Sequence, residues 1–101
     1  MFKHILVPID GSALSGETVA KAITFAQDAA AHGEEVAHVA VHYIVEPSAS
    51  RGHAIIRVAV RGGCDLIFMA SHARSGISAL FLGSETQKVL THSTIPVLVV
   101  R

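Results

Sequence analysis

The sequence has few of the residues on which metal centres and nucleic-acid surfaces depend. Its 101 residues include one cysteine, no tryptophan and only 5% aromatic residues. A single cysteine excludes an internal disulfide and a zinc site built from several thiolates. Eight Lys and Arg residues balance eight Asp and Glu residues, so no basic field exists to hold a phosphate backbone. We therefore expect no nucleic-acid partner.

Long apolar runs are absent as well. No run approaches the ~20 residues of a membrane-spanning helix, and Pro8 and Asp10 interrupt the first run with no small-residue cleavage site behind them. Hydrophobic residues make up 50% of the chain and charged residues 16%, which excludes a disordered chain. We expect one cytoplasmic domain over residues 1–101, without a membrane segment.

Short apolar segments alternate with helical patterns along the chain. Residues 5–9, 36–45, 65–70 and 95–100 predict four strands; Pro8 marks the end of the first, and the second alternates like an edge strand. Helices are predicted from Ser12 or Ser15 to Gly33, around 55–62, and from Gly83 onward. This order predicts βαβ units, hence a Rossmann-like α/β fold with a mostly parallel four-stranded sheet and helices on both faces.

The helical patterns also predict which side chains face the core. In the first helix an apolar stripe is predicted, and in the last helix two inward residues and a capping box. The stripe comprises Val19, Ala22, Ile23, Ala26 and Ala30; the inward pair is Val89 and Leu90, and the box pairs Ser84 with Gln87.

Histidine and cysteine spacing gives no metal or nucleophilic site. His38 and His42 share one face of a predicted strand, where four residues span ~13 Å, too far for one zinc ion. Cys64 precedes a buried strand and fits a small buried hydrophobe better than a reactive thiol. No Ser, His and Asp set has the context of a hydrolase, so catalytic residues are not assigned.

Two segments lie where ligands bind in open parallel sheets, beyond the carboxyl ends of the strands. The first is residues 8–12, in which Asp10 suits a ribose hydroxyl or a metal ion. The second runs from Ala70 to Ala73 and leads to Gly83 and Ser84, a helix start that suits an anion. The alternative is purely structural: Asp10 as a turn residue and Ser84 as a helix cap.

These same segments resemble the universal stress protein family. The stretch FKHILVPIDGS (residues 2–12) resembles the opening of that family's domain. CDLIFMASH (64–72), GSETQKVL (83–90) and IPVLVV (95–100) resemble its C-terminal block, in the same order. The resemblance implies a Rossmann-like fold, a cytoplasmic stress-response role and homodimers, here through the last strand, Val97–Val100. It also implies that many members bind ATP, while others do not.

The resemblance further implies a nucleotide site on this chain, with one departure from the family pattern. The family's glycine signature falls on Ala70, Ala73, Gly83 and Ser84, so both leading glycines are alanine. A methyl group there hinders the approach of the backbone to phosphate, which predicts a weakened ATP site. Asp10 is the expected contact for ribose or for Mg²⁺. The expected nucleotide-binding residues are Pro8, Asp10, Ala70, Ser71, His72, Ala73, Arg74, Gly83 and Ser84.

A second departure concerns the middle of the chain. The family has five strands, and the second strand and second helix are missing here, because the segment 36–45 follows the first helix almost directly. In nucleotide-binding members that second strand supplies part of the adenine wall. Two arrangements remain open: either 36–45 takes the vacant position beside the first strand, or the gap leaves an edge that a second chain fills.

Two functions from different classes follow. The first is a universal stress protein-like regulatory module with a weakened ATP site, which would achieve at most slow ATP hydrolysis because no general base is evident. The second is a nucleotide-free dimeric structural or interaction protein of the same fold.

Overall fold

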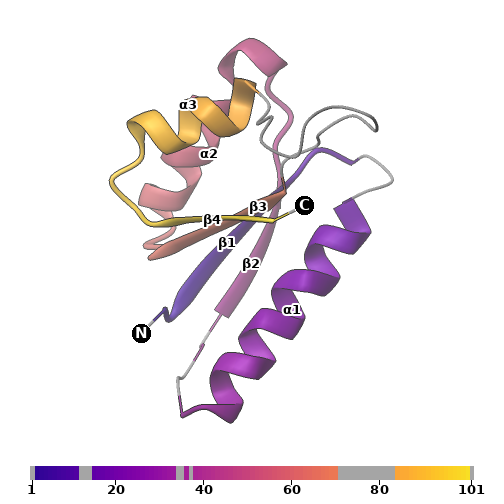
Figure 1. Cartoon of the computed structure of the whole chain (residues 1–101). Helices are drawn as coiled ribbons and strands as arrows, with labels where there is room; N and C mark the ends of the chain where they lie inside the picture. Colours follow the sequence, from indigo (N-terminus) through magenta and orange to yellow (C-terminus); the bar gives the residue numbers. More distant parts are fainter. Residues whose placement is uncertain (1, 12–14, 34–35, 37, 71–83, 101) are drawn as a thin grey trace.

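Helices and strands alternate along the chain as predicted. The structure is a computed structural model that describes residues 2–11, 15–33, 36, 38–70 and 84–100, with Ser48 and Ser84 described by their backbone alone. Its elements, shown in Figure 1, are β1 (His4–Ile9), α1 (Ser15–Ala31), β2 (His38–Tyr43), α2 (Ser48–Arg61), β3 (Leu66–Ala70), α3 (Ser84–His92) and β4 (Val97–Val100).

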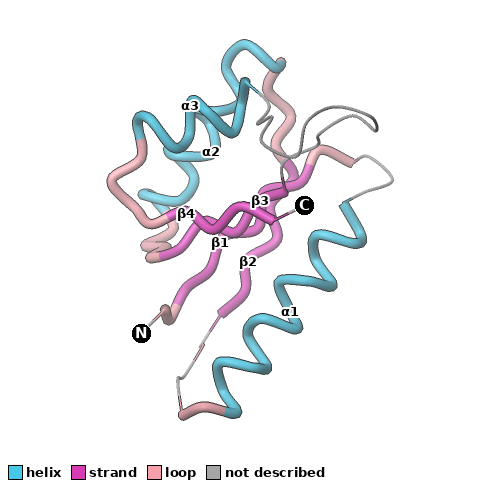
Figure 2. The backbone as a smooth tube through the Cα atoms, viewed as in Figure 1, coloured by secondary structure: helices cyan, strands magenta, loops and turns pink. Residues whose placement is uncertain are grey.

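The four strands form one sheet in the order β2-β1-β3-β4, and every neighbouring pair is parallel. This confirms the predicted Rossmann-like α/β fold, with a fully parallel sheet where a mostly parallel one was expected. Figure 2 shows the strands side by side between the helices. All carboxyl ends of the strands therefore lie at one edge of the sheet, which we call the carboxyl edge.

β2 occupies the position beside β1, which decides between the two arrangements left open by the sequence. The register between them runs from His4 opposite His38 to Ile9 opposite Tyr43. The strand is shorter at both ends than the predicted 36–45, although Ile44 N still donates to Ile9 O at 2.9 Å. The first of the two arrangements, in which this segment takes the position beside the first strand, is therefore the one that the structure has.

Two apolar layers hold the sheet between helices, α1 on one face and α2 with α3 on the other (Figure 1). Because successive side chains of a strand alternate between faces, β1 contributes to both layers. Ile5 and Val7 pack with Ala22 of α1. Leu6 packs on the other face, with Ala59 of α2 and Val89 of α3. The predicted helices on both faces are confirmed.

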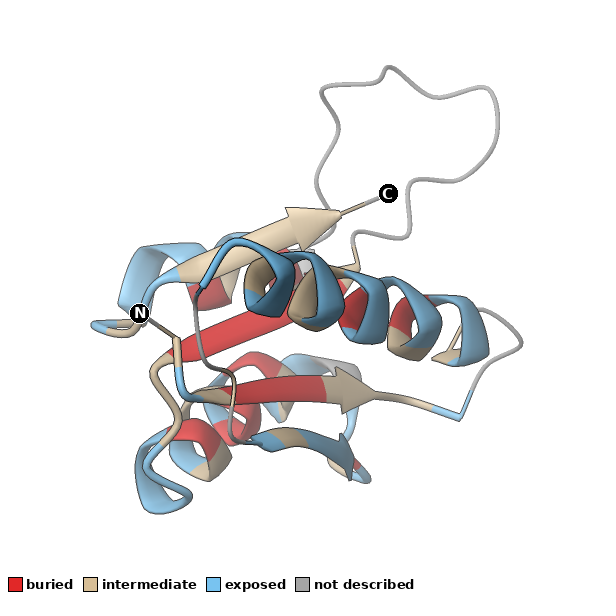
Figure 3. Ribbon diagram, turned by 90° about the horizontal axis from the view of Figure 1, so that it is seen from below, coloured by how far each residue is buried: buried red, intermediate tan, exposed pale blue. Residues whose placement is uncertain are grey.

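The two inner strands are buried and β2 is not, as Figure 3 shows by colour. In β1 and β3 the central residues are buried, while five of the six residues of β2 are exposed. β2 and β4 are the edge strands of the sheet, so the sequence pattern of an edge strand at 36–45 is confirmed.

Three predicted core residues are wrong. Ile23 is 46% exposed, Leu90 is 43% exposed, and Ala30 is exposed. In α1 the buried stripe is turned toward Thr18, Ala22 and Phe25, because the Phe25 ring packs on the Phe68 ring with their centroids 5.7 Å apart. The remaining stripe residues Val19 and Ala26 are partly buried, and Val89 is fully buried as predicted. Among the described helices, none is long and apolar enough to cross a bilayer.

Candidate functional site

Asp10 lies at the carboxyl edge, directly after β1. Its carboxylate Oδ1 accepts a hydrogen bond from Ser15 Oγ at 3.2 Å, which ties it to the start of α1. The side chain is partly buried. Asp10 is followed by Gly11, whose φ of +80° turns the chain away from the strand in a conformation that favours glycine. The carboxylate is thereby held at the end of β1 by the residues on both sides of it.

Tyr43 packs against this turn from the end of the neighbouring strand β2. A Cβ atom added to Gly11 would lie 2.7 Å from Tyr43 Cε2 and 3.2 Å from Tyr43 Oη. The Tyr43 side chain nevertheless remains 54% exposed, so one part of the ring faces solvent. The sequence reasoning did not single out Tyr43. The available signal was that the chain's one tyrosine lies near the end of a predicted strand.

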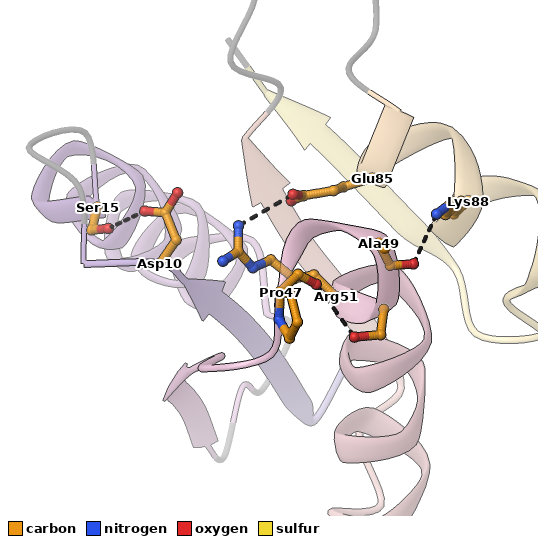
Figure 4. A network of polar contacts seen from close by, with 8 residues as sticks. Asp10, Ser15, Pro47, Ala49, Arg51, Glu85 and Lys88 are labelled. Atoms are coloured by element: carbon orange, nitrogen blue, oxygen red, sulfur yellow. Dashed lines mark hydrogen bonds and ion pairs between the residues drawn. The ribbon is translucent and has the colours of Figure 1, made fainter.

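Arg51, in the first turn of α2, brings a positive charge to the same edge. Its Nη1 donates to Glu85 Oε1 at 3.2 Å, and both side chains are largely buried, with 22% and 29% exposed. Lys88 Nζ donates to the main-chain oxygen of Ala49 at 2.9 Å, which joins α3 to α2. Figure 4 shows the Arg51 guanidinium reaching toward Glu85 from one side of the edge, with Asp10 on the other.

The other predicted site residues fall into two groups. Pro8 is the last residue but one of β1, Ala70 is the last residue of β3, and Ser84 is the first of α3, so all three lie at the carboxyl edge. The second group lies outside the residues that the structure describes. This group consists of Ser71, His72, Ala73, Arg74 and Gly83. The predicted capping box falls there too, because the Ser84 side chain is not described.

Metal-binding side chains do not gather in the described part of the chain, where no group of three His, Cys, Asp or Glu residues forms a site. Asp10 is one carboxylate. Mg²⁺ keeps several waters and is commonly held by one or two carboxylates together with substrate phosphates. The residues present therefore suit Mg²⁺ that arrives with a nucleotide rather than Mg²⁺ held by the protein alone.

The opposite edge of the sheet carries a second polar cluster that sequence spacing missed. His4 and His38 stack with ring centroids 4.8 Å apart, and their Nδ1 atoms are joined by a 3.1 Å hydrogen bond. The spacing in the sequence drew attention to His38 and His42, whereas the parallel register places His38 opposite His4. Asp65 lies at this edge too, where its two carboxylate oxygens accept the main-chain N–H groups of Lys3 and His4.

Cys64 packs partly buried against the core beside α2 and α3. Burial raises the pKa of its thiol, and the negative charge of Asp65 raises that pKa further. A raised pKa reduces the thiolate fraction at neutral pH, and the thiolate is the reactive species. The structure thus agrees with the interpretation of Cys64 as an inert, packing residue.

The parallel sheet with helices on both faces defines an open, Rossmann-like α/β domain. The model of the universal stress protein family matches residues 30–101. The chain belongs to the universal stress protein family, which confirms the resemblance seen in its motifs. Structural alignments extend this likeness of fold through the N-terminal segment.

Two curated relatives share part of the sequence. A universal stress protein from Thermus aquaticus is 42% identical over 48 residues, and one from Methanocaldococcus jannaschii is 40% identical over 47 residues. These matches cover 48% and 46% of this chain but only 35% and 29% of the relatives. The chain thus spans about a third of the length of the curated relatives it matches.

Solved structures of universal stress proteins share the fold across nearly the whole chain. The protein UspA from Lactobacillus plantarum superimposes with a TM-score of 0.65 at 20% identity, covering 98% of this chain and 97% of that one. A universal stress protein crystallised in complex with cAMP gives a TM-score of 0.66 at 18% identity, covering 99% and 97%. At these identities the likeness establishes the fold.

Proposed function

We propose that this domain is a regulatory universal stress protein module that binds an adenine nucleotide weakly at the carboxyl edge of its sheet. The observation that carries the proposal is the contact of Tyr43 with the turn after Asp10. An aromatic ring packed on the turn that directly follows a carboxylate residue supplies the two kinds of contact that an adenosine needs. The ring stacks on the base, and the carboxylate accepts a ribose hydroxyl.

The shift of β2 toward β1 supports this proposal. The family's own second strand, which contributes to the adenine wall in binding members, is missing from this chain. β2 now lies beside β1 along six register pairs, and it ends with Tyr43 opposite Ile9. The adenine wall is thereby rebuilt from a different segment, with an exposed tyrosine face as its surface.

Phosphate binding is the weak part of the proposed site. Ala70 ends β3 where binding members have a glycine, and its methyl group keeps a phosphate away from the backbone. Ser71, His72, Ala73, Arg74, Gly83 and Ser84 complete the phosphate contacts in the proposal, and Asp10 with the phosphates holds Mg²⁺. A family member in complex with cAMP, which carries a single phosphate, is consistent with a site that depends on the adenosine.

Calorimetric titration of the purified domain with adenosine, cAMP and Mg-ATP tests the proposal. A denatured sample is first analysed for co-purified nucleotide. We expect all three ligands to bind, and Asp10→Ala to weaken them by about tenfold, since a hydrogen bond to a charged group is lost. Asp28→Ala removes an exposed carboxylate of α1 as the matched control and leaves the affinities unchanged.

Two outcomes contradict the proposal. One is no heat change with any adenine compound at millimolar concentration, together with no co-purified nucleotide. The other is an equal loss of affinity in Asp10→Ala and Asp28→Ala, which would mean that the ligand does not contact the carboxyl edge.

Ala70→Gly combined with Ala73→Gly should tighten the binding of Mg-ATP more than that of adenosine. In the proposed site only the phosphates contact the segment that holds these two alanines.

The second candidate function is a nucleotide-free dimeric scaffold, which the two edge strands favour. β4 is an edge strand of the described sheet, and the outer backbone groups of an edge strand are those to which another strand can pair. We propose a cytoplasmic homodimer through Val97–Val100 in either function. Light scattering behind gel filtration tests it: a monomer at all concentrations contradicts the dimer, and a dimer without bound nucleotide favours the scaffold.

A further inference from the structure

Arg51 is a charged residue at the carboxyl edge that no motif of the sequence brought forward. It lies in the first turn of α2, which directly follows β2, the strand beside β1. Its side chain is 22% exposed, so the guanidinium is partly withdrawn from water. In Figure 4 it extends from α2 into the space between Asp10 after β1 and Glu85 on α3. A cation thus faces the ends of three elements that meet at the candidate site.

The guanidinium is poorly satisfied where it lies. Among the described residues it makes one hydrogen bond, from Nη1 to Glu85 Oε1 at 3.2 Å. Its Nε is buried and has no hydrogen-bond partner. A guanidinium offers five donors and usually grips a carboxylate or phosphate with two parallel hydrogen bonds. A buried donor without a partner costs free energy, so a ligand that accepts a hydrogen bond from Nε offsets part of the cost of opening the pair with Glu85.

We propose that Arg51 is a phosphate-contacting residue of this site and that Glu85 competes with the phosphate for it. The inference rests on the proposed function and names Arg51 as the residue from which the proposed nucleotide site would gain affinity for phosphate. A phosphate carries more negative charge than the single carboxylate of Glu85 and presents three acceptor oxygens. It satisfies two guanidinium donors where Glu85 satisfies one.

This assignment also gives a site with alanines at the glycine positions a second source of phosphate affinity. A glycine loop binds phosphate through backbone N–H groups, which requires close approach of the main chain. Arg51 reaches the ligand with a long side chain from the neighbouring helix and does not depend on that approach. Glu85, on the first turn of α3, then limits the affinity because the pair must open first.

Arg57 on the same helix provides a matched control. It pairs through Nη2 with Oε2 of Glu46, a residue between β2 and α2, at 3.4 Å, and its side chain is 48% exposed. Arg57→Ala therefore removes one α2 arginine and one ion pair while leaving the pair between Arg51 and Glu85 in place. Circular dichroism and urea unfolding of each variant establish that the fold is retained.

The experiment titrates wild type, Arg51→Ala, Glu85→Gln and Arg57→Ala with pyrophosphate, adenosine and ATP by calorimetry. Arg51→Ala should weaken pyrophosphate and ATP by about tenfold and leave adenosine unchanged. Glu85→Gln should tighten pyrophosphate and ATP by several-fold, because the competing charge is gone. If Arg51→Ala does not fold, the Glu85→Gln result alone tests the competition. Arg57→Ala should change none of the three affinities.

The outcomes separate this inference from the proposed function. Equal effects of Arg51→Ala and Arg57→Ala on pyrophosphate, or weaker pyrophosphate binding in Glu85→Gln, overturn the assignment of Arg51. If adenosine and ATP bind while Arg51→Ala leaves ATP unchanged, the nucleotide proposal stands and the inference fails. If pyrophosphate binds through Arg51 while adenosine does not bind, the inference stands and the adenine site fails.

Discussion

At the scale of single residues, the contact between Gly11 and Tyr43 decides the shape of the candidate site. Gly11 has a φ of +80°, and the space that a side chain would occupy there is filled by the Tyr43 ring. Gly33 has a similar φ of +84°, but no atom lies within 4 Å of its Cβ position. Substitution at Gly33 therefore introduces backbone strain alone, whereas substitution at Gly11 introduces the same strain and also disturbs the packing of Tyr43.

Substitution of Gly11 by alanine should displace Tyr43, whereas Gly33→Ala should not. Both variants lose about 1–2 kcal/mol of unfolding free energy, since an L residue is strained at positive φ. Only Gly11→Ala pushes the ring outward, because its methyl group would lie 2.7 Å from Cε2. Tyr43 is the sole tyrosine of a chain without tryptophan, so quenching of intrinsic fluorescence by acrylamide measures its exposure.

The expected result is stronger quenching in Gly11→Ala than in wild type and no change in Gly33→Ala. Equal quenching in all three proteins would contradict the packing of Tyr43 on the turn. If the ring is displaced as expected, Gly11→Ala should also bind adenosine less tightly than wild type.

Sequence reasoning placed Asp10 at the end of the first strand but did not single out Tyr43 or Arg51, for a physical reason. Asp10 follows its own strand, so a local pattern of an apolar run and a turn is enough to locate it. Tyr43 and Arg51 reach the site because β2 lies beside β1, and this neighbour relation depends on strand order. The prediction of the buried face of the first helix was wrong for a similar reason. Ile23 and Phe25 are both apolar, and the contact of Phe25 with Phe68 decides which of the two side chains turns inward.

At the scale of elements, Asp65 fastens the start of β1 to the start of β3. Its carboxylate accepts the N–H groups of Lys3 at 2.9 Å and His4 at 3.0 Å, and its own N–H donates to His4 O at 2.9 Å. Burial raises the pKa of Asp65, but these main-chain hydrogen bonds, together with the nearby His4, outweigh burial and lower it overall. The direct pairing of β1 with β3 covers only two residue pairs, so this side-chain link supplements it.

The lowered pKa predicts a pH-dependent contribution to stability. A carboxyl group with a lower pKa in the folded state stabilises the fold above its unfolded pKa, about 3.9, and this contribution is lost as pH falls through the folded pKa. Asp65→Asn should therefore lower the unfolding free energy at pH 6–7. The difference from wild type should shrink below about pH 4.

Urea unfolding at a series of pH values measures this effect, with Asp28→Asn on α1 as the matched control. Asp28 is exposed on α1. We expect its variant to follow wild type at every pH. A difference between wild type and Asp65→Asn that stays constant from pH 7 to pH 3 would contradict the assigned role of the carboxylate.

At the scale of the whole molecule, four parallel strands place all their carboxyl ends at the one edge where the nucleotide site is proposed. The alternation of elements, and hence the parallel α/β fold, could be predicted because each element has a local apolar period. The strand order could not, because the pairing of 36–45 with β1 depends on long-range contacts. The same order brings His4 to His38 and leaves β2 and β4 as edges available to a partner.

Main-chain amide NMR during a titration with Mg-ATP tests the central claim most directly, because it reports both binding and location. The account predicts shifts concentrated at Gly11, Tyr43, Arg51 and the start of α3, with the amides of Lys3, His38 and Asp65 at the opposite edge unchanged. Shifts centred on the opposite edge, or no shifts at millimolar Mg-ATP, would contradict a nucleotide site at the carboxyl edge.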